Sequence, residues 1–507
     1  MRVALHRVES DCLKTIYDNM ISKEETLDLV VPDVSADIGR ILDVRGQFLL
    51  SSQKARNDEI HISASVEVSV VYAAEDSGKV QYVMANIPFD MSLPLDGADE
   101  DTKLVTRWEL CGLEARMLNP RKLLLRANVS AHIVAFAPDK FVLWDNLSEE
   151  EKTSVCVLKK EVGHTLVVGV REKSFTVSDE YRLPADKDQN AKMLSASTEI
   201  CVQDVKAVGN KIVIKAVSKT VAVFVSENDG SLFDCLFSTM FSQIIEVDTF
   251  GDNITNSVGV WLKDAEFTMV NGKENGFICS ASLQICAQTV SREAMLSTYA
   301  ADAYSNEFSL NAETAETKMM RCIPTDNLML DLKGRIKPKS TLTEIMYAGV
   351  AGVCTETQGD EIRLNVNISG VGRTESGELE AIELKLSSEE IIELSKGQRL
   401  NISSVCCDKP VITGSAQNAE ISVGVEIKYC IKETFEIDAV CCIEIREDCP
   451  INKEDRPSLV VLCAERETDL WSLAKKYGST MEMIENANIV NGEFSVRCRP
   501  LLIPRAK

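Results

Sequence analysis

The residues that could carry out chemistry in this sequence are scattered along the chain. The histidines stand singly, with neither a zinc-protease motif nor a nucleophile motif around them, and they are His6, His61, His132 and His164. The sequence contains no GxSxG or Walker loop, and the GVG run at 370–372 lies in a strand-like stretch that opens no helix. A hydrolase would need a pocket with a perturbed acid or base, which no stretch offers. We therefore expect a protein that is not an enzyme and uses no cofactor.

The cysteines come closest to a metal-ligating pattern. The chain has 17 of them, without a CxxC or a Cys/His finger spacing. The adjacent pairs Cys406-Cys407 and Cys441-Cys442 could meet in the last third of the chain and hold zinc. Neighbouring side chains on a strand point to opposite faces, however, so both members of a pair cannot easily ligate one ion. We expect buried thiols that act as small hydrophobes, and no metal site.

The elements that position these residues belong to a hairpin that occurs three times. Residues 66–89, 221–241 and 366–386 each read as two alternating strands around a turn that contains glycine. The turns lie at 75–78, 227–230 and 374–377. The first two copies keep a constant offset of 152 residues, which relates Pro32 to Pro184, Gly78 to Gly230 and Phe89 to Phe241. Chance turns do not keep such an offset, so the pattern predicts an internally repeated β protein.

Each repeat supplies five or six short strands with turns at regular spacing, which is typical of an all-β sandwich or barrel. We expect a mainly β fold with β units at 25–140, 141–300 and 301–450, packed together because their connectors are not rich in Gly and Ser. A small α+β domain is expected at 457–507. Residues 10–22 place Leu13, Ile16, Tyr17 and Met20 on one helical face. This spacing predicts an N-terminal helix within 1–24, packed on the first unit or binding a partner.

The composition limits the partners. The chain of 507 residues has 55 Lys and Arg against 78 Asp and Glu, a net charge of −23. This balance opposes binding to nucleic acid or to anionic lipid, which both need basic residues. The first residues, MRVALHRVESDC, lack the apolar core of a signal peptide, and no run of 18 apolar residues occurs. We expect the protein to stay in a reducing cytosol.

The beginning of the first unit resembles a known family. Pro32-Asp33 and the run DIGRIL at 37–42 resemble the opening of the SPOCS (spore-coat structural) domain, formerly a domain of unknown function. Members of that family tend to read LPD…PDI.RIL, whereas this sequence has Ala36 where the family usually has proline. The hairpin that ends in Pro88-Phe89 fits the same family.

The segment after Pro450 resembles a LysM domain. A short strand at 459–462 precedes Leu470, Leu473, Ala474 and Tyr477, which share one helical face. Ser479 followed by Glu482 predicts the start of a second helix, and the run LLIP at 501–504 predicts a closing strand. The runs DLWSLAKKYG at 469–478 and Ala487-Asn488 match LysM positions that mostly form core and caps.

Two loops depart from LysM domains that bind N-acetylglucosamine chains. Those domains read GDT before the first helix and PGQ before the last strand, whereas this chain reads ETD at 467–469 and RCR at 497–499. Glu and Cys side chains stand where glycine would let a ligand approach, so the sugar groove is in doubt. Trp471 follows the core residue Leu470 and is expected to project into solvent as a protein-binding hot spot, or to be half-covered by its own domain. The predicted partner-binding residues are Thr468, Asp469, Trp471, Lys475, Arg497 and Arg499.

Together these parts resemble the architecture of SipL-type spore morphogenetic proteins. The resemblance implies a non-enzymatic scaffold in the mother-cell cytosol, at the surface of the forespore. It also implies that the LysM domain grips the coat-basement ATPase and that the β units recruit or brace other coat proteins. The alternative is a glycan-binding protein that acts on peptidoglycan or spore cortex.

Overall fold

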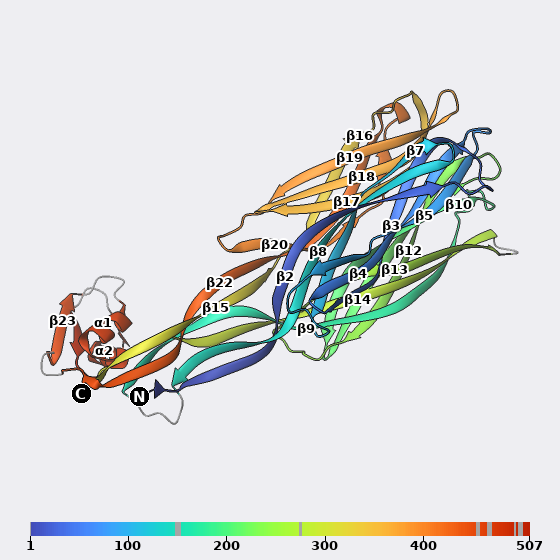
Figure 1. Cartoon of the computed structure of the whole chain (residues 1–507). Coiled ribbons are helices and arrows are strands. Elements are labelled where there is room, and N and C mark those ends of the chain that lie inside the picture. The colour runs from blue at the N-terminus through green and yellow to red at the C-terminus, as the bar shows by residue number, and fades with distance from the viewer. Residues whose placement is uncertain are drawn as a thin grey trace.

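The computed structural model describes residues 2–147, 154–272, 276–452, 457–463, 469–490, 493–494 and 500–506. Strands form most of the described chain, and its two α-helices lie near the C-terminus (Figure 1). The strands fall into three units that repeat one order: a long leading strand, a three-stranded meander and a closing hairpin. We call them the first unit (2–147), the second unit (154–305) and the third unit (308–450). The structure is mainly β, as expected.

The first unit contains β1 (Arg2–Val3), β2 (Leu5–Val30), β3 (Ile38–Arg56), β4 (Glu59–Ala74), β5 (Val80–Pro88), β6 (Met91–Pro94), β7 (Lys103–Asn119) and β8 (Lys122–Leu147). The second contains β9 (Val155–Arg182), β10 (Lys192–Val208), β11 (Lys211–Val225), β12 (Leu232–Glu246), β13 (Ile254–Gly272) and β14 (Gly276–Ser305). The third contains β15 (Phe308–Pro324), β16 (Leu328–Arg335), β17 (Leu342–Gln358), β18 (Glu361–Thr374), β19 (Leu379–Ile391), β20 (Gln398–Cys407), β21 (Val411–Thr413), the 3-10 helix η1 (Ala416–Asn418) and β22 (Glu420–Pro450).

Each unit is a sandwich of two antiparallel layers. The meanders β3-β4-β5, β10-β11-β12 and β17-β18-β19 form one layer of each unit. The closing hairpin and the leading strand form the other layer, as in the order β2-β8-β7 of the first unit. Apolar residues that alternate along these strands, such as Val66, Val68 and Val70, are fully buried between the two layers.

The three predicted hairpins are confirmed. The pairs β4/β5, β11/β12 and β18/β19 are antiparallel and flank the predicted turns. Gly78, Gly230 and Gly377 have φ angles of 66°, 70° and 82°, a left-handed conformation that glycine adopts without steric cost. The glycines are therefore a requirement of the turns, which explains why they mark the repeat in the sequence.

The predicted helix at 10–22 is wrong, because these residues lie in β2, which pairs with β8 along nearly its whole length. A bulge between Thr15 and Tyr17 changes the side on which the following residues lie. A strand with such a bulge can carry apolar residues three and four apart, as a helix does. Leu13, Tyr17 and Ile21 are partly buried against the sandwich cores. Pairing with β8 therefore overrides the local helical spacing.

The three units surround a common axis. The edge strand β7 of the first unit contacts β17 of the third, β13 of the second contacts β3 of the first, and β20 of the third contacts β10 of the second. Their shared core includes Val71, Val223 and Val371. These valines occupy one register position, because they pair with Asp43, Ser195 and Tyr347 at the same point of each meander. The units are thus packed together in a pseudo-threefold arrangement.

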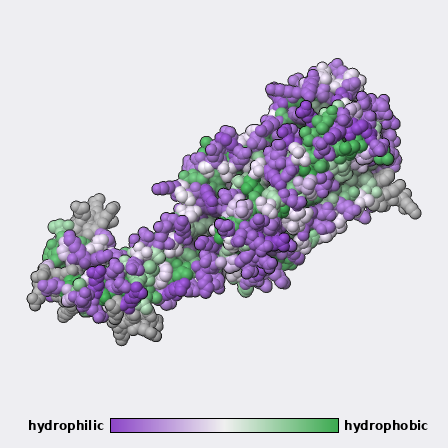
Figure 2. Space-filling view, viewed as in Figure 1, coloured by the Kyte–Doolittle hydropathy of each residue, from purple (hydrophilic) through white to green (hydrophobic). Residues whose placement is uncertain are grey.

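A narrow arm extends from this body. The paired strands β2/β8, β9/β14 and β15/β22 continue beyond the sandwiches and share a second core that includes Val3, Val155, Ala303 and Ile443. Strand β22 alone has 31 residues, which corresponds to about 100 Å of extended chain. Figure 1 shows the arm running from the body to the small C-terminal segment, with the N-terminus close to the same end. Hydrophilic residues cover most of the face in Figure 2.

Candidate functional site

The C-terminal segment consists of β23 (Leu459–Cys463), α1 (Leu470–Tyr477), α2 (Met481–Ala487), β24 (Ile489–Val490), β25 (Glu493–Phe494) and β26 (Pro500–Pro504). Strand β23 pairs antiparallel with β26, so the two helices lie between paired strands in the chain order. Both predicted helices and the predicted closing strand are confirmed. No helix in the described part of the chain is long and apolar enough to cross a membrane.

Capping residues set the limits of both helices. The carboxylate of Asp469 accepts hydrogen bonds from the backbone N–H groups of Trp471 and Ser472, which have no partner within the helix. Gly478 ends α1 in the left-handed conformation, with φ of 67°. The hydroxyl of Thr480 accepts from Met483 N at 3.1 Å and caps α2. This cap lies one residue after the Ser479 that the sequence indicated.

The expectation that Trp471 is solvent-exposed is wrong. Trp471 is only 7% exposed, because its indole packs against Tyr304 at the end of β14. The ring centroids lie 4.8 Å apart, and the rings meet edge to face at 68°. The indole Nε1 donates to Asp302 Oδ2 at 2.8 Å. The sequence argument placed Trp471 away from the core of its own segment, but that side of α1 faces the arm. Asp302 and Tyr304 are about 170 residues away in the chain, and no local signal could have identified them.

Further polar contacts join the C-terminal segment to the arm. The Lys475 ammonium donates to both oxygens of Asp302, at 2.9 and 2.8 Å. The hydroxyl of Tyr304 and the amide of Asn306 both donate to the carbonyl of Ser479, at 2.8 and 3.0 Å. We call these contacts together with Trp471 the docking contact. Burial alone would raise the pKa of Asp302, but the hydrogen bonds from Lys475 and Trp471 outweigh it and lower the pKa.

Half of the predicted partner-binding residues can be placed. Asp469, Trp471 and Lys475 lie together on α1 and at its cap. Trp471 and Lys475 both contact Asp302 of the arm, whereas Asp469 caps the helix. Thr468, Arg497 and Arg499 lie outside the described residues, so the two altered sugar loops lie there for the most part.

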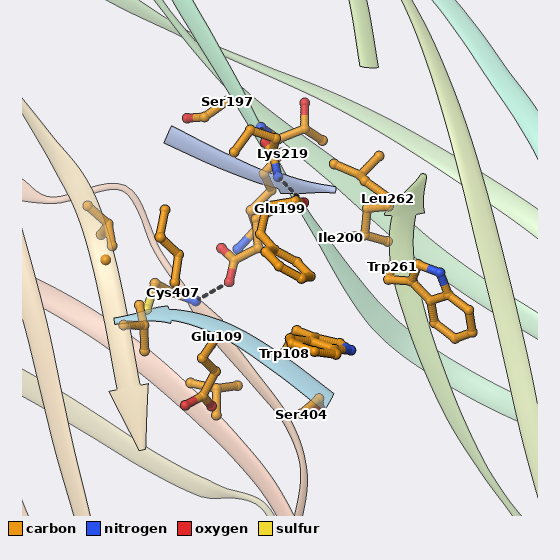
Figure 3. Close-up of a pocket in the computed structure, with 18 of the residues that line it drawn as sticks. Trp108, Glu109, Ser197, Glu199, Ile200, Lys219, Trp261, Leu262, Ser404 and Cys407 are labelled. Atoms are coloured by element: carbon orange, nitrogen blue, oxygen red, sulfur yellow. Dashed lines mark hydrogen bonds between the residues drawn. The ribbon is translucent and has the colours of Figure 1, made fainter. Parts of the chain in front are cut away.

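A second candidate site is a cavity of about 330 Å³ on the pseudo-threefold axis. Each unit lines it with the corresponding part of its first meander strand, at residues 45–48, 197–200 and 349–353. Trp108 and Trp261 of the closing hairpins form apolar walls, and Trp108 stacks on Phe48 with centroids 4.9 Å apart (Figure 3). Sequence reasoning missed this cavity. Its signal was present in the repeat offset, which brings matching strand positions to one axis.

Polar groups are concentrated in and beside this cavity. The carboxylate of Glu199 points toward β20 and accepts from Cys407 N at 3.0 Å, as drawn in Figure 3. Burial raises the pKa of Glu199 to about 7, although the Cys407 N–H and the charge of Lys219 oppose the effect. Nearby, Arg45 Nε and the Tyr347 hydroxyl both donate to Asp43 Oδ2, at 2.7 and 2.8 Å. This buried group joins the first unit to the third.

An ion cluster joins the same two units farther from the axis. Asp18 on β2 receives hydrogen bonds from His132 Nε2 at 2.7 Å and from Arg399 of β20 at 2.6 Å, and Lys432 of β22 lies 3.5 Å away. Burial alone would raise the pKa of Asp18, but the His132 hydrogen bond and the charges of Lys432 and Arg399 lower it to about 2. Asp18 therefore has partners in both units, His132 in its own unit and Arg399 and Lys432 in the third.

Comparison with known families finds a match within the first of these units. Residues 37–118 match the family model described as SipL, SPOCS domain. The span covers the first meander and β7, including the DIGRIL run and the first hairpin. No curated protein and no solved structure matches the chain. Residues 37–118 are therefore similar to a SPOCS domain, which suggests a protein related to sporulation.

Proposed function

We propose that the protein is a non-enzymatic scaffold of spore-coat assembly. In this proposal three SPOCS units form the body, and a LysM-type segment at the tip of the arm grips a partner. The observation that supports it best is the arm itself, because paired strands from all three units carry the C-terminal segment away from the body (Figure 1). Such a shape lets one protein contact two layers of an assembly.

The assignment of the second and third units rests on their architecture. Both repeat the leading strand, meander and closing hairpin of the first unit, with turn glycines in the same conformation. The assignment of the LysM-type segment rests on its order of elements and on Asn488. The side chain of Asn488 bonds the carbonyls of Ile484 and Leu502 and the N–H of Leu502, which holds α2 against β26. The structural role of Asn488 therefore explains why the Ala487-Asn488 pair matches the LysM sequence pattern.

The proposed partner is the coat-basement ATPase on the forespore surface, within the mother-cell cytosol, and other coat proteins would bind the β units. Partner binding through Trp471 and Lys475 competes with the docking contact, because both use the same side chains. The partner must therefore supply an acidic and aromatic surface similar to that of Asp302 and Tyr304.

Binding of the purified ATPase to the full-length chain tests this proposal. Trp471→Glu should weaken binding at least about thirty-fold, because a buried interface tryptophan contributes about 2 kcal/mol or more. Asp302→Ala frees the same face of α1 and should strengthen binding. Equal binding by the wild type and Trp471→Glu would refute the proposed surface. Sedimentation of the full-length chain with purified peptidoglycan tests the glycan alternative, and the scaffold proposal expects the protein to stay in the supernatant.

A further inference from the structure

A group of three potential ligands lies where the second unit meets the third. Glu199 and Cys201 are on β10, and Cys406 is on β20, 205 residues farther along the chain. One carboxylate oxygen and the two Sγ atoms all lie within 4.8 Å of one another. Glu199 and Cys201 are two residues apart on one strand, so their side chains share a face. Both cysteines are buried, at 6% and 8% exposure.

The donor set suits a thiophilic divalent cation. Two thiolates and one carboxylate are ligands that Zn²⁺ accepts in tetrahedral sites, with Zn–S of about 2.3 Å and Zn–O of about 2.0–2.2 Å. Ligand atoms at the corners of such a site are about 3.5–3.8 Å apart. The distances between the ligand atoms, at most 4.8 Å, therefore need to shorten by no more than about 1.3 Å. Cys406 takes part without Cys407, because neighbours on β20 point to opposite faces.

The surroundings of Glu199 leave it able to coordinate. One of its oxygens accepts a hydrogen bond from Cys407 N at 3.0 Å (Figure 3). Hydrogen bonds of this kind orient the residues that bind a metal ion. No described residue donates to the other oxygen of Glu199. The nearby Lys219 ammonium is engaged by Asp408 Oδ1 at 2.8 Å, which offsets its charge. Glu199 lines the axial cavity, and Cys201 and Cys406 line a second cavity of about 330 Å³, where a water molecule has room to serve as a fourth ligand.

A similar group lies between the first unit and the third, and it provides a natural control. Glu109, Cys111 and Cys354 also place their ligand atoms within 4.8 Å. Both oxygens of Glu109 are occupied, however, by Thr355 N at 2.7 Å, by Thr355 Oγ1 at 2.6 Å and by Arg107. Coordination by Glu109 would break these bonds in a buried setting, where unpaired donors are costly. The two groups thus differ in the availability of the carboxylate.

We propose that Glu199, Cys201 and Cys406 bind one zinc-class divalent cation, which fastens the second unit to the third. The site is independent of the docking contact and of the proposed coat partner. Because its ligands come from two units, metal binding favours the packed arrangement over separated units.

The test uses the full-length chain, reduced and treated with a chelator, then loaded with Zn²⁺ or Co²⁺ and desalted. We expect one metal per chain, and a Co²⁺ charge-transfer band whose intensity corresponds to two thiolates. Cys406→Ser should weaken binding at least about 100-fold. The matched control Cys354→Ser should bind as the wild type does. Circular dichroism checks that both variants fold.

Three results would overturn the proposal. The first is a wild-type Co²⁺ spectrum without thiolate ligation, which needs no variant and is unaffected by misfolding. The second is equal retention of metal by Cys406→Ser and the wild type. The third is loss of the band in Cys354→Ser but not in Cys406→Ser, which would assign the metal to the Glu109 group.

Discussion

Removing the carboxylate of Asp302 should release the C-terminal segment from the arm. Asp302→Ala deletes the acceptor for the indole N–H of Trp471 and the partner of the Lys475 ammonium, all within 2.9 Å. A hydrogen bond to a charged group contributes about 1.5–3 kcal/mol. The Lys475 pair is partly exposed and adds about 1 kcal/mol or less. The edge-to-face contact between Tyr304 and Trp471 stays and retains about 0.5–1.5 kcal/mol.

The loss should therefore be about 1.5–4 kcal/mol, which lowers the ratio of docked to undocked chains about 10- to 900-fold. Hydrogen exchange of peptides from α1, followed by mass spectrometry, reports this ratio when the amides exchange through undocking. We expect faster exchange in α1 for Asp302→Ala and an intermediate rate for Asp302→Asn, which keeps an acceptor for the indole. Peptides from the sandwich cores should exchange as in the wild type.

A matched control separates docking from a general loss of negative charge. Asp331→Ala removes an exposed carboxylate on β16 whose ion-pair partner is Lys333 at 2.8 Å, and it should leave α1 unchanged. If Asp302→Ala leaves the exchange of α1 within about twofold of the wild type, then the carboxylate does not hold the segment. The described contacts would then be incidental to its position.

Three further changes test how the units are joined. Asp18→Asn should lower the free energy of unfolding, measured in urea at pH 7, by about 1–2 kcal/mol. The folded pKa of Asp18, about 2, lies below its unfolded value, so its stabilisation is complete above about pH 4 and is lost as the pH falls toward 2. The difference in stability between the wild type and the variant should therefore narrow over that pH range. Gly352→Ala should destabilise the chain by about 1–3 kcal/mol in thermal unfolding, because the added Cβ would lie 2.8 Å from a backbone oxygen of β7. The control Gly259→Ala on β13 should be nearly neutral, because the added Cβ would have no atom within 4 Å. Tyr347→Phe should cost about 1.5–3 kcal/mol in urea unfolding, because it removes a hydrogen bond to the buried carboxylate of Asp43, and an unchanged midpoint would refute that role.

The sequence allowed the parts of the fold that depend on neighbouring residues to be predicted. The hairpin turns are local, since a residue in the left-handed conformation is needed at Gly78, Gly230 and Gly377. The helices of the C-terminal segment are local too, because Asp469 and Gly478 cap α1 through contacts within one turn. The false helix at 10–22 shows the limit of this approach. A bulge beside Ile16 produced a helical spacing inside a strand.

The candidate sites depend on contacts that no local pattern encodes. The exposure expected for Trp471 was wrong because Tyr304 of the second unit covers it. Glu199 and Cys406 are likewise brought together only by the packing of two units. The sequence argument against zinc treated Cys406 and Cys407 as a pair, whereas the structure pairs Cys406 with Cys201. Repeat register could have indicated which strands meet on the axis, but not which of their residues touch.

The axis also explains why the three units cannot be identical copies. Asp43, Ser195 and Tyr347 occupy the same register position in the three units. In three identical units, the same residue type would therefore occupy all three positions around the axis. Three carboxylates in this buried place would repel one another, and Arg45 could neutralise only one of them, as it does Asp43. At the position corresponding to Arg45, the third unit has Gly349, whose missing Cβ makes room for the Arg45 guanidinium. One acid, one phenol and one glycine therefore fit around a single arginine. This division of roles favours a single chain that carries three diverged units over an assembly of three equal ones.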